Sequence, residues 1–492
     1  MRKYVIAVDE GTTGARAIAF DRSGRMACMA YHEFPQHFPK PGWVEHDPLE
    51  ISASVDRALQ EVFAKLPKDS VDSIGITNQR ETVILWDRKT GRPACNAIVW
   101  QCRRTAARCE ALAKTAKAKV IRKKTGLPCD PYFSASKIEW QFKHSPAVRK
   151  LARQGRLAFG TPDTWVLWNL TGGKAHCTDY TNASRTMLFD INKKRWDAEL
   201  LKLFGVPADI LPEVRKSSSV FGHTVKNGNI PAGIPISAIA GDQQAALYGQ
   251  TCFEPGSIKN TYGTGAFALL NAGAKRPADG KLITTLGCDG GGNPVYVLEG
   301  SVFIAGAGVQ WLRDGLKILE TSPESERIAT SVKDNGGVYF VPALSGLGAP
   351  FWDADARGAF FGLTRGTARA HLVRAVLESM CYSTRAVLEE MAKASGLKLR
   401  SLRVDGGAAK NNFICSFQSG ISGLEILRPE AAELTALGAA YLAGLCTGFW
   451  RSADEIKKLP IKNKIFKPPF SKKIADGFYA GWRDAVSRTL TK

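Results

Sequence analysis

A hairpin pattern that occurs once in each half of the chain constrains the fold more than any other feature. Residues 4–21 (YVIAVDEGTTGARAIAFD) predict a strand, a turn at Gly11-Thr12-Thr13 and a second strand. Residues 256–270 (GSIKNTYGTGAFALL) repeat that order around Gly263-Thr264-Gly265. Such a repeat indicates two related α/β domains that face one nucleotide.

The turn itself suits phosphate, because its backbone N–H groups and threonine hydroxyls can donate to phosphate oxygens. Asp9, directly before the first turn, would repel a phosphate unless Mg²⁺ lay between them. On this stretch alone, an ordinary surface hairpin with a glycine turn explains the residues equally well.

Length and composition set the frame for these hairpins. A chain of 492 residues exceeds one ordinary core, so we expect two domains, at residues 1–247 and 248–492. The net charge of +21 favours anionic ligands, but the basic residues are spread out, so we expect no specific nucleic-acid partner. Eleven cysteines without a CxxC pair predict reduced thiols. Neither a signal peptide nor an apolar run of about 18 to 20 residues is present, which predicts a cytoplasmic protein without a membrane span.

Polar residues follow a predicted strand at residues 71–76. Arg80 and Glu81 supply donors and an acceptor suited to adjacent hydroxyl groups of a small polyol, although a surface ion pair of little energetic value is the alternative. Trp100, at the end of a predicted strand 97–100, could form a wall of the same pocket or belong to the core.

Asp242 follows a further predicted strand at residues 234–240, and a helix is expected from Ala245. This position at a strand-to-helix switch makes Asp242 the strongest catalytic candidate. Its alternative, weighed equally, is a helix N-cap.

A third glycine-rich element, residues 404–412, follows a strand and opens a helix at Asn411, which fits a nucleotide's sugar and phosphate. The chain contains no GxxxxGK[ST] segment, so it is not a P-loop enzyme. Further helices are predicted at residues 48–66 (with Asp47 as N-cap), 103–118, 134–142, 309–319, 371–395 and 436–443.

Three phosphate elements and an aspartate at a domain boundary resemble the actin-like ATPase superfamily. Residues 132–140 (YFSASKIEW) and 358–378 look like the two signatures of the FGGY carbohydrate kinases. The segments that are similar to the glycerol kinases of that family run almost the whole length: PKPGWVEHDP, GITNQRET, WQCRRT, DYTNASRTMLF, AGDQQAALYGQ, NTYGTGAF and VDGGAAKNNF. The resemblance implies an α/β protein of two actin-like, ribonuclease H-like domains with a catalytic cleft between them.

The same resemblance implies an activity and the residues behind it. It implies transfer of phosphate from ATP to glycerol, with Mg²⁺ as cofactor, Asp242 as general base, Asp9 and Asp242 near the metal, and a homo-oligomer, dimer or tetramer. The implied glycerol-binding residues are Thr12, Arg80, Glu81, Trp100, Tyr132, Asp242, Gln243 and Phe267. The implied nucleotide-binding residues are Thr12, Thr13, Gly14, Arg16, Thr264, Gly306, Gln310, Gly407 and Asn411.

Some positions depart from the family pattern. Glu10 stands where many relatives have Gln, and Gly14 where many have Ser. Residues 223–233 (HTVKNGNIPAG) lack the fructose 1,6-bisphosphate loop and the phosphorylatable histidine of some relatives, which predicts no regulation by either route. Three other functions remain open at this point: an FGGY kinase for a longer polyol or a ketose, an actin-like or chaperone-type ATPase, and, in last place, a protein whose basic surface binds nucleic acid.

Overall fold

The computed structural model describes residues 3–430, 433–460 and 462–491. It forms two units. The first comprises Met1–Phe253, Thr284–Tyr296 and Glu433–Pro460, and the second comprises Glu254–Ile283, Val297–Ala432 and Ile461–Lys492. The expected division after residue 247 falls close to Phe253, but it does not anticipate the two later segments that cluster with the first unit.

The first unit is built on a mixed sheet with the order β13-β14-β5-β1-β2-β3. Its strands are β1 (Tyr4–Glu10), β2 (Gly14–Asp21), β3 (Met26–Glu33), β5 (Val71–Asn78), β13 (Ser218–His223) and β14 (Pro235–Gly241). The predicted hairpin is β1 and β2, which pair antiparallel, while β1, β5 and β14 run parallel. The carboxyl ends of these three strands therefore meet at one edge, where the polar segments begin.

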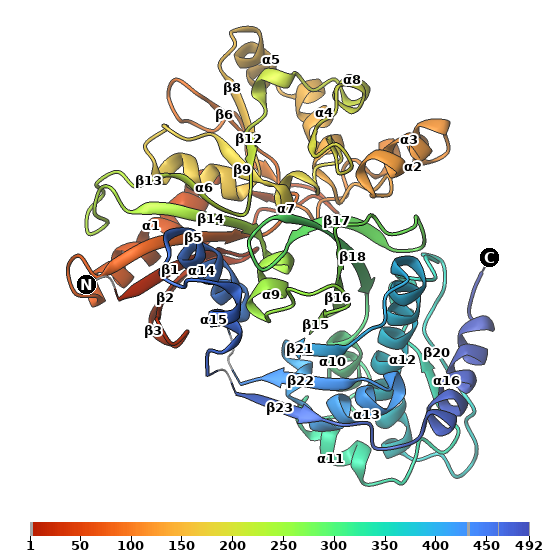
Figure 1. Ribbon diagram of the computed structural model, residues 1–492. Helices are drawn as coiled ribbons and strands as arrows, with labels where there is room; N and C mark the ends of the chain where they lie inside the picture. The colour runs from red at the N-terminus through yellow and green to blue at the C-terminus, as the bar shows by residue number, and fades with distance from the viewer. Residues whose placement is uncertain (1–2, 431–432, 461, 492) are drawn as a thin grey trace. The chain divides into compact units, whose positions relative to one another are not determined.

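Helices cover both faces of this sheet. Apolar residues of α1 (Pro48–Lys65) and α6 (Pro162–Leu170) share a core with Ile6 and Val8. On the opposite face α14 (Leu434–Thr447) packs against β5, and α9 (Asp242–Gly249) packs against α14, as Figure 1 shows. The close approach of α14 to β5 requires Gly75, since a Cβ there would lie 2.3 Å from the carbonyl oxygen of Ala439. Sequence order hides this arrangement, because α14 lies far from β5 along the chain.

The remaining elements of the first unit surround the sheet. They are β4 (Glu45–His46), β6 (Ile84–Asp87), β7 (Ala97–Ile98), α2 (Ala106–Ala113), α3 (Ala116–Thr125), α4 (Ser134–His144), α5 (Pro146–Arg153), β8 (Leu157–Gly160), β9 (Cys177–Asp179), α7 (Tyr180–Ala183), β10 (Phe189–Asp190), β11 (Arg195–Trp196), α8 (Ala198–Phe204), β12 (Glu213–Arg215) and α15 (Ala453–Lys457).

One predicted helix of this unit is wrong. Residues 103–118 do not form a single helix, because Thr115 has an extended backbone between α2 and α3. Its hydroxyl donates to the carbonyl oxygen of Leu112 at 2.8 Å, which ends α2. The helix predicted from Pro48 is confirmed, and the Asp47 carboxylate caps it by accepting from the Leu49 N–H at 2.8 Å.

The second unit repeats the pairing order of the first. The sheet to which it contributes runs β17-β18-β16-β15-β21-β22-β23, although most of β17 and the start of β18 fall within Thr284–Tyr296, which clusters with the first unit. The strands are β15 (Ile258–Tyr262), β16 (Ala266–Gly273), β17 (Ile283–Cys288), β18 (Pro294–Val302), β21 (Ser401–Asp405), β22 (Glu425–Pro429) and β23 (Asn463–Phe466). As with β1, β2, β5 and β14, β15 pairs antiparallel with β16 and parallel with β21, and β21 runs parallel to β22. The expected α/β architecture with an internal duplication is thus confirmed.

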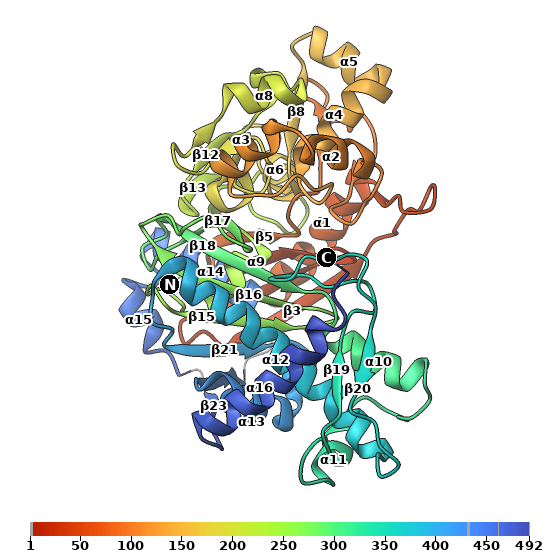
Figure 2. The ribbon, with the colours of Figure 1, turned by 90° about the vertical axis from the view of Figure 1, so that its right-hand side faces the viewer.

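Helices complete the second unit. They are α10 (Gly306–Asp314), α11 (Glu324–Thr330), α12 (Arg369–Ser395), α13 (Asn412–Ser422) and α16 (Lys472–Ser487), with the hairpin β19 (Tyr339–Val341) and β20 (Ala359–Phe361). In Figure 2 the long α12 and α16 lie together beside β19, where the Trp482 indole donates to the Phe340 carbonyl at 3.1 Å. Among the described residues, none of the helices combines the length and hydrophobicity that a bilayer crossing requires. The eleven cysteines are free thiols, as expected.

Candidate active site

Asp242 lies where β14 turns into α9. Gly241 is the N-cap residue, and Asp242 is the first residue of the helix, so the N-cap interpretation of Asp242 is wrong. Its carboxylate accepts from the Gln243 N–H at 2.7 Å and lies 3.1 Å from Nε of Arg80. About a third of the side chain (34%) remains exposed. The carboxylate is therefore oriented by neighbours and still open to a ligand.

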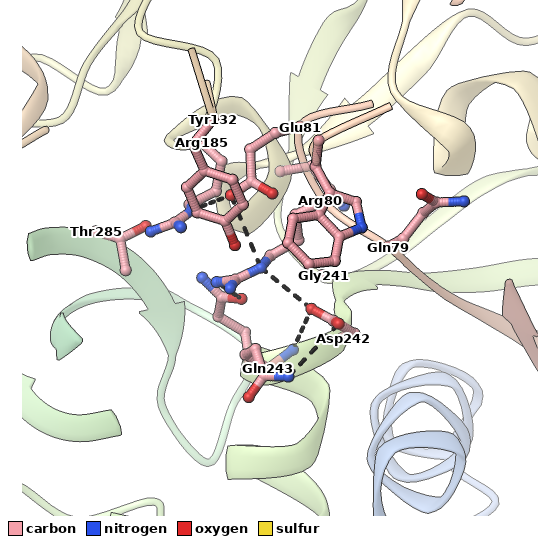
Figure 3. Close-up of polar contacts among 12 residues, drawn as sticks. Gln79, Arg80, Glu81, Tyr132, Arg185, Gly241, Asp242, Gln243 and Thr285 are labelled. Carbon is pink, nitrogen blue, oxygen red and sulfur yellow. Dashed lines mark hydrogen bonds and ion pairs between the residues drawn. The ribbon is translucent and has the colours of Figure 1, made fainter. Parts of the chain in front are cut away.

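Arg80 and Glu81 are both buried, so they are not a surface ion pair. In Figure 3 the Arg80 guanidinium lies between the two carboxylates, with Nε 3.9 Å from Glu81 Oε1. Its Nη1 donates to the Gln244 side-chain oxygen at 3.2 Å. Gly241 makes room for the arginine, because a Cβ there would lie 2.8 Å from its Cγ and Cδ atoms. This packing holds Arg80 in one position.

Glu81 has a left-handed backbone, with φ of 63°. Its carboxylate accepts from Nε of Arg185 at 2.5 Å, and the Arg185 guanidinium lies 5.4 Å from the ring centre of Tyr132 (Figure 3). Arg185 was not among the predicted site residues, since no spacing in the sequence connects it to Glu81. Its burial at 0% exposure beside a carboxylate shows that it belongs to this site.

Aromatic residues and a threonine complete this side of the site. The indole N–H of Trp100 donates to the Thr12 hydroxyl at 3.0 Å, and the Trp100 and Tyr132 rings meet edge to face at 5.6 Å. Trp100 follows β7, which is only two residues long rather than the predicted 97–100. These contacts link the first phosphate-type turn to the predicted polyol residues.

Asp9 lies at the end of β1, next to that turn. The pKa of its carboxyl is raised to about 6. Burial is the main cause, the Arg16 guanidinium at 3.6 Å acts in the opposite direction, and the charges of Asp242 and Glu433 add to the rise. Arg16 also pairs with Glu433 at 2.7 Å. In the part of the chain that the structure describes, no cluster of three or more His, Cys, Asp or Glu could hold a metal ion. Because the charge of Asp242 raises the pKa of Asp9, these two carboxylates lie close enough to interact.

The structure explains why residue 14 is a glycine, where many relatives have Ser. A Cβ there would lie 2.6 Å from the carbonyl oxygen of His32 and 2.7 Å from the hydroxyl of Tyr31. That hydroxyl is 3.5 Å from Oγ1 of Thr13, and the Tyr31 ring centre is 5.5 Å from the Arg16 guanidinium carbon. Tyr31, which the sequence did not single out, fills the space that a side chain at residue 14 would need.

Glu10 is the other residue that departs from the family pattern. Its side chain is buried at 0% exposure, and its carboxyl accepts a hydrogen bond from the Gln79 amide at 2.9 Å. Burial raises the pKa of its carboxyl well above the usual range, against the effect of that hydrogen bond. Burial thus favours the neutral carboxyl, which has the shape and neutrality of glutamine.

The second unit contains a cavity of about 470 Å³. It is lined by all the nucleotide-binding residues predicted for this half: Thr264, Gly306, Gln310, Gly407 and Asn411. Phe267, predicted for the polyol site, lies on β16 and is not among the residues that line this cavity. Two lining residues that the sequence missed, Ser325 and Glu326, come from α11, whose residues carry no phosphate-type signal.

The duplicated sheets and the two groups of site residues define a two-unit carbohydrate kinase. The chain belongs to the FGGY family of carbohydrate kinases: the family's N-terminal domain matches residues 4–249 and its C-terminal domain matches residues 258–446. Within that family it is similar to the glycerol kinase of Enterobacter sp., with 52% identity over 99% of this chain and 98% of the relative. It is 54% identical to the glycerol kinase of Symbiobacterium thermophilum, again over 99% and 98% of the two chains.

Solved structures agree with this assignment. The glycerol kinase of Plasmodium falciparum with ADP superposes with a TM-score of 0.94, at 37% identity over 99% of this chain and 98% of that one. A gluconate kinase from Lactobacillus acidophilus shares the fold alone, with a TM-score of 0.89 and 22% identity over 99% and 97% of the chains.

Proposed function

We propose that this chain is an ATP-dependent glycerol kinase, which transfers the γ-phosphate of Mg·ATP to a terminal hydroxyl of glycerol and gives sn-glycerol 3-phosphate and ADP. That reaction is the entry step of glycerol catabolism. The observation that carries the proposal is the arrangement of Asp242, Arg80 and Glu81 beside Trp100 and Tyr132. Full-length similarity to glycerol kinases supports it.

Glycerol needs groups for three hydroxyls and an apolar surface for its short carbon chain. Glu81, fixed by Arg185, is an acceptor for one hydroxyl, and Arg80 is a donor for another. The edge-to-face pair of Trp100 and Tyr132 supplies the apolar surface. Gln243 and Phe267 are assigned to the same site by the family resemblance.

Asp242 accepts the proton of the attacking hydroxyl. Its carboxylate is partly exposed and its orientation is set by Arg80 and the Gln243 N–H. A general base must lie within hydrogen-bond reach of the hydroxyl whose proton it takes, and a carboxylate that is held in place but partly exposed is suited to that role. Phosphoryl transfer otherwise depends on in-line positioning and on neutralising charge, which is the role of Arg16 and the turn at Thr12, Thr13 and Gly14.

The cavity of the second unit is the proposed nucleotide site, with Thr264, Gly306, Gln310, Gly407 and Asn411 as its contacts. Asp9 and Asp242 would hold Mg²⁺, directly or through water, because carboxylate oxygens are the ligands that this ion prefers. When bound, the ion would neutralise phosphate charge. We also propose a cytoplasmic homo-oligomer, dimer or tetramer.

Two other functions make different predictions. A kinase for a longer polyol or a ketose would use the same Asp242 but would require room for further carbon atoms and hydroxyl groups. An ATPase that drives partner binding would have no use for a buried Arg80–Glu81 pair next to Asp242.

ADP release from Mg·ATP, measured with glycerol, with xylitol and without a polyol, separates these functions. Our proposal predicts that release requires glycerol, and that the phosphorylated product is sn-glycerol 3-phosphate by ³¹P NMR and a stereospecific dehydrogenase assay. Release without any polyol would identify an ATPase, and release with xylitol but not glycerol would identify a different sugar-alcohol kinase.

A further inference from the structure

Lys137 is a buried lysine that the proposed reaction does not use. It lies on α4 with 0% of its surface exposed. Its ammonium donates three hydrogen bonds, to the backbone carbonyls of Tyr132 at 2.5 Å, Phe133 at 3.1 Å and Glu81 at 3.2 Å. An ammonium in the interior is costly unless all its donors are satisfied, and these three carbonyls satisfy them.

The three carbonyls come from two segments that are far apart in the sequence and both contribute to the proposed glycerol site. Glu81 follows β5, whereas Tyr132 and Phe133 precede α4. The Glu81 carbonyl also accepts from the Ser134 hydroxyl at 3.0 Å. Two donors on one carbonyl hold a backbone whose φ of 63° is unfavourable for a residue with a side chain.

We propose that Lys137 is a positioning residue for glycerol: its ammonium ties the Glu81 backbone to the Tyr132 segment, so that the Glu81 carboxylate and the Tyr132 ring keep the spacing that the substrate requires. This inference rests on the proposed function. Because Lys137 contacts backbone atoms of the polyol site and none of the predicted nucleotide residues, its effect falls on glycerol rather than on ATP.

The charge state of Lys137 gives the inference a second readout. Burial lowers its pKa to about 8, against the opposing effects of Glu81, Cys102, Cys109 and Asp130. These groups face it from the segment after β5, from the segment before α2, from α2 itself and from the loop before α4.

Below pH 8 the ammonium has three N–H donors for three carbonyls. Above pH 8 the neutral amine has two donors and a lone pair that faces an oxygen. The link that Lys137 makes between the Glu81 backbone and the Tyr132 segment therefore weakens as the pH rises through the pKa of Lys137. The KM for glycerol should rise with it.

The first test compares Lys137→Met with Lys143→Met. Lys143 lies on the same helix, is 59% exposed at its side chain and pairs with Glu139 at 3.0 Å, so it is a matched control. At pH 7, Lys137→Met should raise the KM for glycerol about 10- to 100-fold, as expected for a misplaced binding group, with the KM for ATP within about twofold. Lys143→Met should leave both constants within about twofold. An unchanged KM for glycerol, or an equal rise in both constants, would overturn the inference.

The second test needs no variant, so it decides the matter even if Lys137→Met does not fold. Between pH 7 and pH 9.5, the wild-type KM for glycerol should rise severalfold above pH 8 while the KM for ATP stays level. A flat KM for glycerol across this range would refute the role of Lys137. Wild-type ADP release with glycerol at pH 7 tests the proposed function separately, and if another polyol proves to be the substrate, the same ratios are measured with that polyol.

Discussion

At the residue scale, the site depends on how buried charges are paired. Glu81 is 1% exposed and has two arginines near its carboxylate, Arg185 at 2.5 Å and Arg80 at 3.9 Å. Arg80 in turn lies 3.1 Å from Asp242. Removing one member would leave another charge buried without compensation, so these side chains act as one group rather than as separate contacts.

His176 illustrates what burial does to a titratable group outside the site. Its Nε2 donates to the Phe159 carbonyl at 2.8 Å in the neutral form, and its ring lies edge-on to Trp86. Burial lowers the pKa of His176 to about 4, against the effect of the Phe159 hydrogen bond. Between pH 6.5 and pH 4 the unfolded chain binds a proton at this residue and the folded chain does not. Its contribution to stability is therefore lost as the pH falls through this window.

We predict that His176→Gln reduces the loss of stability between pH 7 and pH 5 by about 2 kcal/mol, because the unfolded chain no longer gains that proton. Thermal unfolding at the two pH values measures it. His144→Gln, at an exposed histidine on α4, is the control and should leave the difference unchanged. If the wild type and His176→Gln lost the same amount of stability between pH 7 and pH 5, His176 would not be held in its neutral form by burial.

At the element scale, the position of Asp242 depends on the crossing of α9 and α14. Two glycines allow the contact: a Cβ on Gly438 would lie 1.9 Å from the Ala245 carbonyl oxygen, and one on Gly249 would lie 2.0 Å from that of Leu434. These neighbours are backbone atoms, so they cannot turn away as a flexible side chain could. The helix that carries Asp242 is thus seated by a helix from near the C-terminal end of the chain.

Gly438→Ala should therefore force the two helices apart. We predict a loss of about 2 kcal/mol or more in stability, typical of overpacking, together with a lower kcat because Asp242 moves. The control is Gly477→Ala on α16, where a Cβ meets nothing within 4 Å and should stabilise the helix by about 0.5–1 kcal/mol. Unfolding midpoints and kcat for both variants test this. A Gly438→Ala enzyme with wild-type stability would contradict the crossing.

The sequence predicted elements and site residues where the signal is local. The two hairpins, the helix capped by Asp47 and the strands β5 and β14 that precede the polar segments all have such signals, and each of these elements was found. The place of α14, the pairing of Arg185 with Glu81 and the filling of the Gly14 space by Tyr31 depend on distant contacts, which no spacing encodes. The helix predicted over residues 103–118 failed because the Thr115 hydroxyl competes with the backbone hydrogen bonds of the helix.

At the scale of the whole molecule, the proposed polyol residues Arg80, Glu81, Trp100 and Tyr132 belong to the first unit, and the proposed nucleotide cavity belongs to the second. Phosphoryl transfer needs both. Ligand binding to each unit can nevertheless be followed separately, because a ligand that binds the folded state raises the unfolding temperature by mass action.

We predict that Trp100→Ala loses most of the glycerol-induced rise in unfolding temperature and keeps the rise induced by ADP. Gln310→Ala, in the cavity of the second unit, should show the reverse. At about 100 times Kd each ligand should add about 2.7 kcal/mol of stability, and thermal unfolding with each ligand measures it. If either substitution abolished both rises, the assignment of the two ligands to separate groups of residues would be wrong.

The most direct test of the account is phosphoryl transfer by Asp242→Asn. The asparagine keeps an oxygen for Arg80 but cannot take the proton of the glycerol hydroxyl, so glycerol-dependent ADP release should fall about 10²- to 10⁴-fold. Glycerol and ADP should still raise the unfolding temperature of the variant, since their other contacts remain. A variant that releases ADP at the wild-type rate would contradict Asp242 as the base and with it the proposed site.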